Sequence, residues 1–125
     1  MDREVAIIGG SMTKFGQRDA WIRELLAQAG EECLADAGVE PDAVDHVYVS
    51  NMASGEFEGQ GGIMNAVAHD LGLLPAYSQR IDQTSSSGGA GMYAAWQSIK
   101  SGASDMTLLV GGEKMTHKGT GGATD

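Results

Sequence analysis

The chain has 125 residues, 42% of them hydrophobic and 20% charged, a balance that fits one soluble globular domain and excludes a disordered or fibrous chain. Its 17 acidic and 8 basic residues give a net charge of −9, which argues against nucleic acid as a partner. The acidity fits general solubility or, as an open alternative, a high-salt cytoplasm. No apolar run approaches the roughly 18 residues of a membrane span, and the N-terminal apolar stretch is too short for a signal peptide. We therefore predict a cytoplasmic protein.

Cysteine and histidine argue against a metal site. Cys33 is the only cysteine, so neither an internal disulfide nor a cysteine-based metal cage can form. The three histidines, His46, His69 and His117, are widely separated and show no metal-ligand spacing. We therefore predict no structural or catalytic metal.

The first half of the chain alternates predicted strands and helices. Residues 5–8 are a short, largely β-branched run before two glycines, which predicts a first buried strand. Asp19 is the predicted N-cap of a helix whose apolar residues recur at helical spacing as far as Ala37, with Gly38 in the C′ position. His46–Ser50 predicts a second strand.

The second half continues the alternation. Residues 51–62 are predicted as a loop, and the apolar spacing of residues 63–71 predicts a second helix that Gly72 stops. Residues 77–81 predict a third, weaker strand, and residues 106–110 predict a fourth, buried one.

A third helix is predicted between the last two strands. It begins near Ser86 or Ser87 and ends by Gly102, and we expect Met92 and Trp96 on its core-facing side. The resulting order is β-α-β-α-β-α-β with mostly short connections. This order predicts an α/β fold, a mostly parallel sheet with helices on both faces, in one domain or one piece of a larger one.

Generic glycine-rich motifs are absent. The segment after the first predicted strand lacks the G-x-G-x-x-G spacing of dinucleotide-binding folds, and the segment after the fourth lacks the G-K-[ST] ending of a P-loop. None of the clustered serines has a glycine two positions before it, which excludes a G-x-S-x-G nucleophile elbow.

The turn at residues 82–91, with the sequence DQTSSSGGAG, is the best local candidate for a functional site. It follows a predicted strand, at the sheet edge where α/β proteins bind ligands, and it precedes a helix N-terminus that favours negative charge. A nucleophile placed there gains stabilisation of its anion and a backbone donor for an oxyanion. Alternatively, Ser85, Ser86 and Ser87 merely cap the helix. The residues alone leave both interpretations open.

The same turn resembles the active-site pattern of thiolases, in which a cysteine is followed by two small residues and a glycine at the start of a buried helix. Counting back three residues from Gly88 aligns Ser85 with that cysteine. VAIIGGSMTKFG at residues 5–16 is similar to archaeal-type and sterol-carrier-type thiolases. SGEFEGQGGIMNAVAHDLGL at residues 54–73 and LLVGGEKMTH at residues 108–117 also resemble the family, in the same order along the chain.

The resemblance implies that residues 1–125 are part of a thiolase N-terminal domain with a thiolase-like fold. It implies an acyltransferase that acts on acetyl-CoA or 3-oxoacyl-CoA, by Claisen condensation or thiolytic cleavage, through an acyl-enzyme on Ser85. The coenzyme A thioester is then the substrate, and no separate cofactor is expected. The resemblance further implies a homodimer or tetramer with the third strand near the two-fold axis, and a small OB-fold acyl-CoA-binding protein as a candidate partner.

Two departures from the family pattern leave alternatives open. Serine replaces cysteine, and because an alcohol is a much weaker acid than a thiol, Ser85 needs a positioned general base. The family's catalytic histidines and second cysteine lie in a C-terminal half without a counterpart here, and neither His69 nor His117 is assigned that role. We therefore expect the 125-residue chain alone to be inactive. The alternatives are a non-catalytic thiolase-like subunit that binds acyl-CoA or supports an active partner, and a condensing enzyme that acts on carrier-protein thioesters.

Two further residues have expected roles beside this turn. Glu113 is similar to a glutamate of the family and is expected to be structural, bonding a neighbouring loop. Arg80 lies just before the turn and is expected either to contact a phosphate or an interface, or to form a solvated ion pair.

Overall fold

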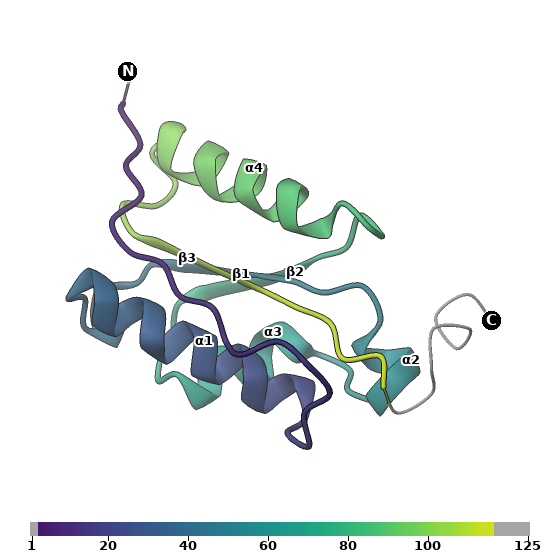
Figure 1. Cartoon of the computed structure of the whole chain (residues 1–125). Helices are drawn as coiled ribbons and strands as arrows, with labels where there is room; N and C mark the ends of the chain where they lie inside the picture. Colours follow the sequence, from purple (N-terminus) through teal and green to yellow (C-terminus); the bar gives the residue numbers. More distant parts are fainter. Residues whose placement is uncertain (1–2, 117–125) are drawn as a thin grey trace.

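Three parallel strands form the centre of the structure, a computed structural model that describes residues 3–116 (Figure 1). β1 (His46–Ser50) lies between β2 (Tyr77–Ile81) and β3 (Thr107–Gly111). Each strand starts level with its neighbours, since His46 is opposite Tyr77 on one side and Thr107 on the other. The carboxyl ends of all three strands therefore meet at one edge of the sheet.

Helices cover both faces of this sheet (Figure 1). α1 (Ile22–Ala37) and α3 (Ile63–Asp70) pack on one face, and α4 (Ser87–Lys100) packs on the other. This arrangement confirms the predicted α/β fold. None of the helices within residues 3–116 combines the length and apolar content needed to span a membrane.

Two short helical segments complete the described chain. The 3-10 helix η1 (Pro41–Ala43) precedes β1, and α2 (Ser54–Glu58) follows it. Residues 51–62 were predicted as loop throughout, and α2 corrects that prediction. Gly59 ends this short helix in the left-handed conformation, with φ 68°.

The hydrophobic core lies between the sheet and the α1–α3 layer. Val47 and Val49 of β1 have no exposed surface, because both point from the central strand toward α1 and α3. Burying each such aliphatic side chain stabilises the fold by about 1.5–3 kcal/mol. The other large members of this cluster are Ile22, Leu26 and Leu34 of α1, Ile63 and Val67 of α3, Leu108 and Val110 of β3, and Val44, Leu71 and Leu73 from the connecting segments.

The start of α1 differs from its prediction. The N-cap is Trp21 rather than Asp19, and its N–H is accepted by Glu24 at 3.0 Å. The next amide, of Ile22, donates to both carboxylate oxygens of Glu58, at 2.6 and 2.9 Å. A carboxylate that is distant in sequence thus satisfies the helix terminus, which local sequence could not reveal. The predicted end of α1, at Ala37 with Gly38 after it, is confirmed.

The predicted first strand is wrong for the described structure, because residues 5–8 belong to no strand of it and Ile7 is 80% exposed. Hydrogen bonds on either side of residues 5–8 hold this segment on the protein instead. Arg3 donates to the carbonyl oxygen of Ile99 at 2.9 Å, and the Gly10 N–H donates to Asp36 at 2.9 Å. It therefore passes from the α4 layer to the α1 layer (Figure 1). A β-branched run favours an extended backbone, but it does not by itself supply a partner strand.

The packing face of α4 also differs from the prediction. The helix buries Ser87, Gly91 and Ser98, whereas Met92 and Trp96 are 52% and 44% exposed. Because α4 is apolar on nearly its whole circumference, periodicity could not identify the face that packs on the sheet. The small residues do so, since they let the helix backbone approach the strands.

Candidate active site

The carboxyl ends of the three strands are joined by hydrogen bonds. Asn51, just after β1, donates from Nδ2 to the carbonyl oxygen of Gly112 at 3.0 Å, after β3. Arg80, near the end of β2, donates from Nη2 to the carbonyl oxygen of Met52 at 3.3 Å. The loops that follow the strands thus form one connected edge, and the turn before α4 belongs to it.

Ser85 lies in this turn, two residues before the first residue of α4. The residue is exposed, and its hydroxyl has no hydrogen-bond partner among residues 3–116. It does not point into packed core, and the helix starts where the sequence predicted. The Ser85 hydroxyl is therefore open to solvent at this turn.

The two serines that follow Ser85 differ from it. Ser86 donates from Oγ to the carbonyl oxygen of Gln83 at 2.9 Å. Ser87 Oγ donates to the carbonyl oxygen of Thr84 at 2.7 Å and accepts the N–H of Gln83 at 2.8 Å. Both hydroxyls therefore hold the backbone of the turn rather than capping the helix amides, and of the three serines only Ser85 has a hydroxyl that the turn does not use.

The first turn of α4 is open toward solvent. Gly88 and Gly89 are exposed, and a Cβ added at either would meet no atom within 4 Å. Amides in the first turn of a helix have no intrahelical carbonyl partner, and they carry a partial positive charge. An anion or an oxyanion beside Ser85 would find these donors unobstructed by side chains.

Glu113 binds the loop that follows β1. Its carboxylate accepts the N–H groups of Met52 and Ala53, the latter at 3.3 Å, and Asn51 Nδ2 at 3.2 Å. Burial of the carboxylate nevertheless raises its pKa, and these hydrogen bonds only partly oppose that shift. The expected loop-bonding role is confirmed.

Arg80 forms an ion pair with Asp82, at 2.9 Å between Nη2 and Oδ2. Of the roles that the sequence left open for this arginine, the structure shows the ion pair. Asp82 itself was not singled out by the sequence. Aspartate is common in turns, so its residue type alone gives no signal of this ion pair.

No histidine of the described residues contacts Ser85. His69 lies at the exposed end of α3 beside Asp70, at 3.4 Å, and His46 pairs with Ser98 at 2.7 Å near the opposite end of the sheet. His117 lies outside the described residues. Within residues 3–116 there is also no group of three side chains suited to hold a metal ion.

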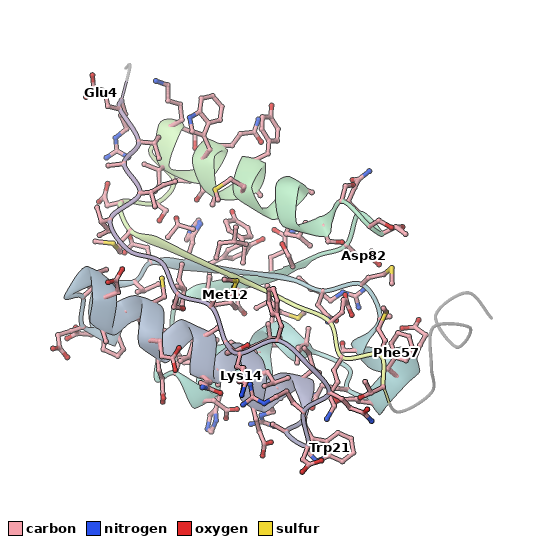
Figure 2. All side chains as sticks on the ribbon, viewed as in Figure 1. Glu4, Met12, Lys14, Trp21, Phe57 and Asp82 are labelled. Carbon is pink, nitrogen blue, oxygen red and sulfur yellow. The ribbon has the colours of Figure 1, made fainter. Side chains whose placement is uncertain are left out.

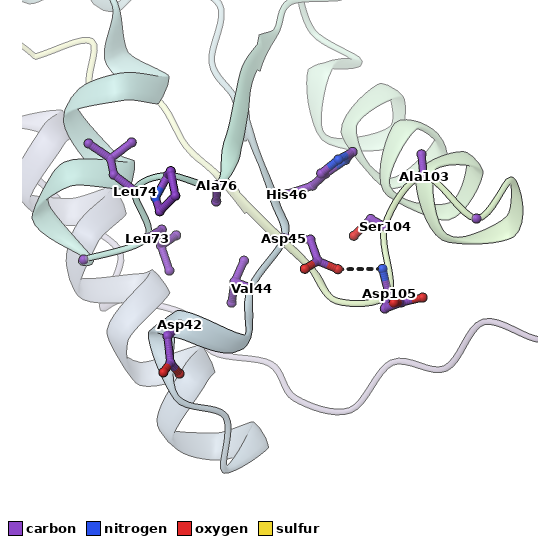
Figure 3. Close-up of a pocket in the computed structure, with 13 residues that line it drawn as sticks. Asp42, Val44, Asp45, His46, Leu73, Leu74, Ala76, Ala103, Ser104 and Asp105 are labelled. Carbon is purple, nitrogen blue, oxygen red and sulfur yellow. Dashed lines mark hydrogen bonds between the residues drawn. The ribbon is translucent and has the colours of Figure 1, made fainter.

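An open depression of about 550 Å³ lies at the amino ends of the strands, away from Ser85 (Figure 3). Its polar groups stabilise the fold: Asp45 accepts the N–H groups of Asp105 at 2.7 Å and of Met106 at 3.2 Å. These bonds hold the pKa of Asp45 below its ordinary value. The depression therefore adds no reactive group to the candidate site.

The arrangement of three parallel strands with helices on both faces is also found in a known class of α/β proteins. The structure is similar to that of 3-oxoacyl-[acyl-carrier-protein] synthase III from Aquifex aeolicus, with a TM-score of 0.72 and 22% identity over 79% of this chain and 32% of that chain. This likeness defines a thiolase-like fold. The family described as Thiolase, N-terminal domain, matches residues 5–125, and the chain belongs to this family.

Curated relatives support this assignment. The chain is 40% identical over 115 residues to acetyl-CoA acetyltransferase of Methanocaldococcus jannaschii, covering 91% of this chain and 29% of that protein. It is 29% identical over 118 residues to sterol carrier protein 2 of Gallus gallus, covering 92% of this chain and 21% of that protein. The chain thus spans less than a third of the length of these relatives.

Proposed function

We propose that the protein is an acyltransferase of thiolase type that acts on acetyl-CoA or 3-oxoacyl-CoA, with Ser85 as the acyl-accepting residue. The observation that carries the proposal is the exposed Ser85 hydroxyl, which the turn does not use and which precedes the N-terminus of α4. The family and the acetyl-CoA acetyltransferase relative support the reaction class.

The first chemical step is acyl transfer to Ser85. Oγ attacks the thioester carbonyl carbon, the carbon–sulfur bond breaks, and the proton of the hydroxyl leaves with coenzyme A as its thiol. The negative charge that develops on the carbonyl oxygen needs N–H donors, and the open first turn of α4 is suited to provide them. One such donor contributes on the order of 100- to 1,000-fold in rate in acyl-transfer enzymes.

The proton of Ser85 needs an acceptor from outside residues 3–116. None of the described histidines contacts Ser85, and a serine hydroxyl is not appreciably ionised at neutral pH. We assign the general base and most of the coenzyme A pocket to further sequence of a full-length protein. The 125-residue chain alone is accordingly expected to be inactive.

A non-catalytic subunit is the second candidate function. It is favoured by one specific observation, the serine at the position where the family resemblance places a cysteine. An oxygen ester is a less activated acyl donor than a thioester, so this replacement also disfavours the carbon–carbon step. Such a subunit would bind acyl-CoA or support an active partner without becoming acylated.

Acylation of the full-length protein separates the two candidates. After incubation with acetyl-CoA, peptide mapping by mass spectrometry should find an acetyl group on Ser85, and Ser85→Ala should abolish it. Ser86→Ala is the matched control, since its hydroxyl bonds the turn and should leave the adduct in place. Retained binding of coenzyme A without any adduct would establish the non-catalytic subunit instead.

For the assembly we propose a homodimer or tetramer with β2 near the two-fold axis. β2 is an edge strand of the described sheet, and Tyr77 at its start is 53% exposed. An unpaired edge of this kind is a ready site for pairing with a second copy. Sedimentation analysis of the full-length protein tests the proposal. Tyr77 donates its N–H to Asp45 of the β1 side, so the N–H of the next residue, Ser78, faces the free edge, and Ser78→Pro, which removes that donor, should weaken the dimer.

A further inference from the structure

Thr84, the residue before Ser85, has a backbone conformation that its residue type disfavours. Its φ is 53°, and it is the only non-glycine residue with a positive φ among residues 3–116. A β-branched side chain is strained in this left-handed region, so the conformation persists only where neighbouring contacts enforce it. The turn must therefore contain groups that hold Thr84 in place.

The carboxylate of Asp82 is such a group, and Figure 2 labels it at the turn that leads into α4. Its Oδ1 accepts the N–H of Thr84 at 2.9 Å, and its Oδ2 accepts Nη2 of Arg80 at 2.9 Å. Both oxygens are thus engaged, one by the backbone of the turn and one by a cation on β2. This arrangement suits a carboxylate that fixes geometry rather than one that accepts the proton of Ser85.

Arg80 is itself fixed at the strand ends. The same Nη2 atom that bonds Asp82 also bonds the carbonyl oxygen of Met52, while Glu113 accepts the N–H of Met52. One residue of the loop after β1 is therefore held from the β2 side by a cation and from the β3 side by a carboxylate. The position of Asp82 follows from contacts with all three strand ends.

The direction of the Ser85 side chain depends on this chain of contacts. Its hydroxyl bonds no described residue, so the backbone of the turn determines where it points. The Ser87 hydroxyl fixes two other groups of the turn, the N–H of Gln83 and the carbonyl oxygen of Thr84. The backbone directly before Ser85 is fixed at the N–H of Thr84, which donates to the Asp82 carboxylate.

We propose that Asp82, held by Arg80, is the positioning residue of Ser85: it keeps Thr84 at positive φ and so presents the Ser85 hydroxyl on the open side of the turn. The inference rests on the proposed acylation of Ser85, which it deepens. Asp82 acts through the backbone and does not touch the acyl group.

The acylation rate of the full-length protein with acetyl-CoA tests this role. Asp82→Ala should lower the maximal rate on the order of 100-fold, as expected for a misplaced nucleophile, and should leave the acetyl-CoA concentration at half-maximal rate nearly unchanged. Asp82→Asn keeps an oxygen that accepts the Thr84 N–H and should lose far less. A loss with Asn as large as that with Ala would contradict the proposal that the hydrogen bond to the Thr84 N–H carries the effect.

A second substitution tests whether the lost rate comes from the backbone conformation of Thr84. Glycine adopts positive φ without strain, so Thr84→Gly introduced into Asp82→Ala should recover much of the lost rate. Asp105→Ala is the matched control, because Asp105 forms an ion pair with Arg3, is 80% exposed and lies at the other end of the sheet. It should leave acylation unchanged. An absence of rescue by glycine would contradict positioning through Thr84.

A crystal structure of full-length Asp82→Ala separates this inference from the proposed function. We expect Thr84 to leave the positive-φ region and Ser85 to move with it. If Thr84 stays near φ 53° and acylation is unchanged, the positioning role is wrong while Ser85 remains the acyl acceptor. If Thr84 moves but the unsubstituted protein never becomes acylated, the proposed function fails and the structural role of Asp82 stands.

Discussion

Gly91 of α4 lies so close to Ser50 of β1 that no side chain fits between them. A Cβ added at Gly91 would overlap Ser50 Oγ and would lie 2.7 Å from Cδ1 of Leu109. Ser50 Oγ in turn donates to the carbonyl oxygen of Ser87 at 2.7 Å, in the first turn of the same helix. The position of the helix, and with it the turn that carries Ser85, depends on this contact.

Gly91→Ala should therefore destabilise the protein by about 1–3 kcal/mol, because the added methyl group overpacks the helix–sheet contact. Urea unfolding measures this difference. The matched control is Gly88→Ala in the same helix, where an added Cβ meets nothing within 4 Å. That substitution should be neutral or stabilising by up to about 1 kcal/mol. Equal effects at both positions would contradict the close approach of Gly91.

The three serines of the turn should respond differently to alanine. Ser87→Ala leaves the Gln83 N–H without its acceptor and should cost about 1–3 kcal/mol of unfolding free energy. Ser85→Ala removes a hydroxyl that bonds no described residue and should change stability by less than about 0.5 kcal/mol. Denaturant titration of the two variants checks the contrast, and an equal loss in both would show that Ser85 also holds the turn.

Glu113 should give stability a pH dependence of known sign. Burial raises the pKa of its carboxyl in the folded protein, so the folded state binds the proton more tightly than the unfolded state. This contribution to stability is fully present below the unfolded pKa and is lost as the pH rises through the folded pKa. Glu113→Gln lacks it. The free energy of unfolding of Glu113→Gln relative to the unsubstituted protein should therefore rise as the pH increases from the ordinary glutamate range, about pH 4, upward. A difference that falls over this range would contradict the raised pKa.

The N-terminal segment should tolerate polar substitution. Ile7 is 80% exposed, so Ile7→Ser should change the unfolding free energy of the 125-residue chain by less than about 0.5 kcal/mol. Val47→Ala, in the fully buried centre of β1, is the comparison and should cost about 2 kcal/mol or more. Thermal or urea unfolding measures both. A large loss at Ile7 would show that residues 5–8 are packed as a strand.

The sequence predicted those elements whose signals are local. The alternating, β-branched run at His46–Ser50 and the glycine at position 38 mark a strand and a helix end by themselves, and both were found where expected. The strand at residues 77–81 was weaker in pattern, but it also has the predicted bounds. In these segments backbone preference and tertiary packing agree.

Features that depend on distant partners escaped prediction. Glu58 accepts the first amide of α1, that of Ile22, from 36 residues away, so the local pattern indicated Asp19 instead. Residues 5–8 have the composition of a strand, yet no strand of the described structure pairs with them. Met92 and Trp96 were expected to be buried but are exposed, because a helix that is apolar on nearly its whole circumference gives no signal for the face that packs on the sheet.

At the candidate site the sequence identified the reactive position but not its support. Ser85 follows from the resemblance to a known active-site pattern. The Asp82 carboxylate and the strained Thr84 backbone involve no rare residue type, so only their geometry reveals the contact. The separate roles of Ser86 and Ser87 likewise required hydrogen-bond directions, because three identical residues in a row are equivalent in sequence.

The chemical nature of the acyl adduct tests the central claim most directly. The full-length protein, quenched in acid after reaction with acetyl-CoA, should carry an acetyl oxygen ester on Ser85 that survives neutral hydroxylamine. The Ser85→Cys variant should form a thioester at the same position that hydroxylamine removes. An adduct on the unsubstituted protein that hydroxylamine removes, or one that persists in Ser85→Ala, would show that another residue accepts the acyl group.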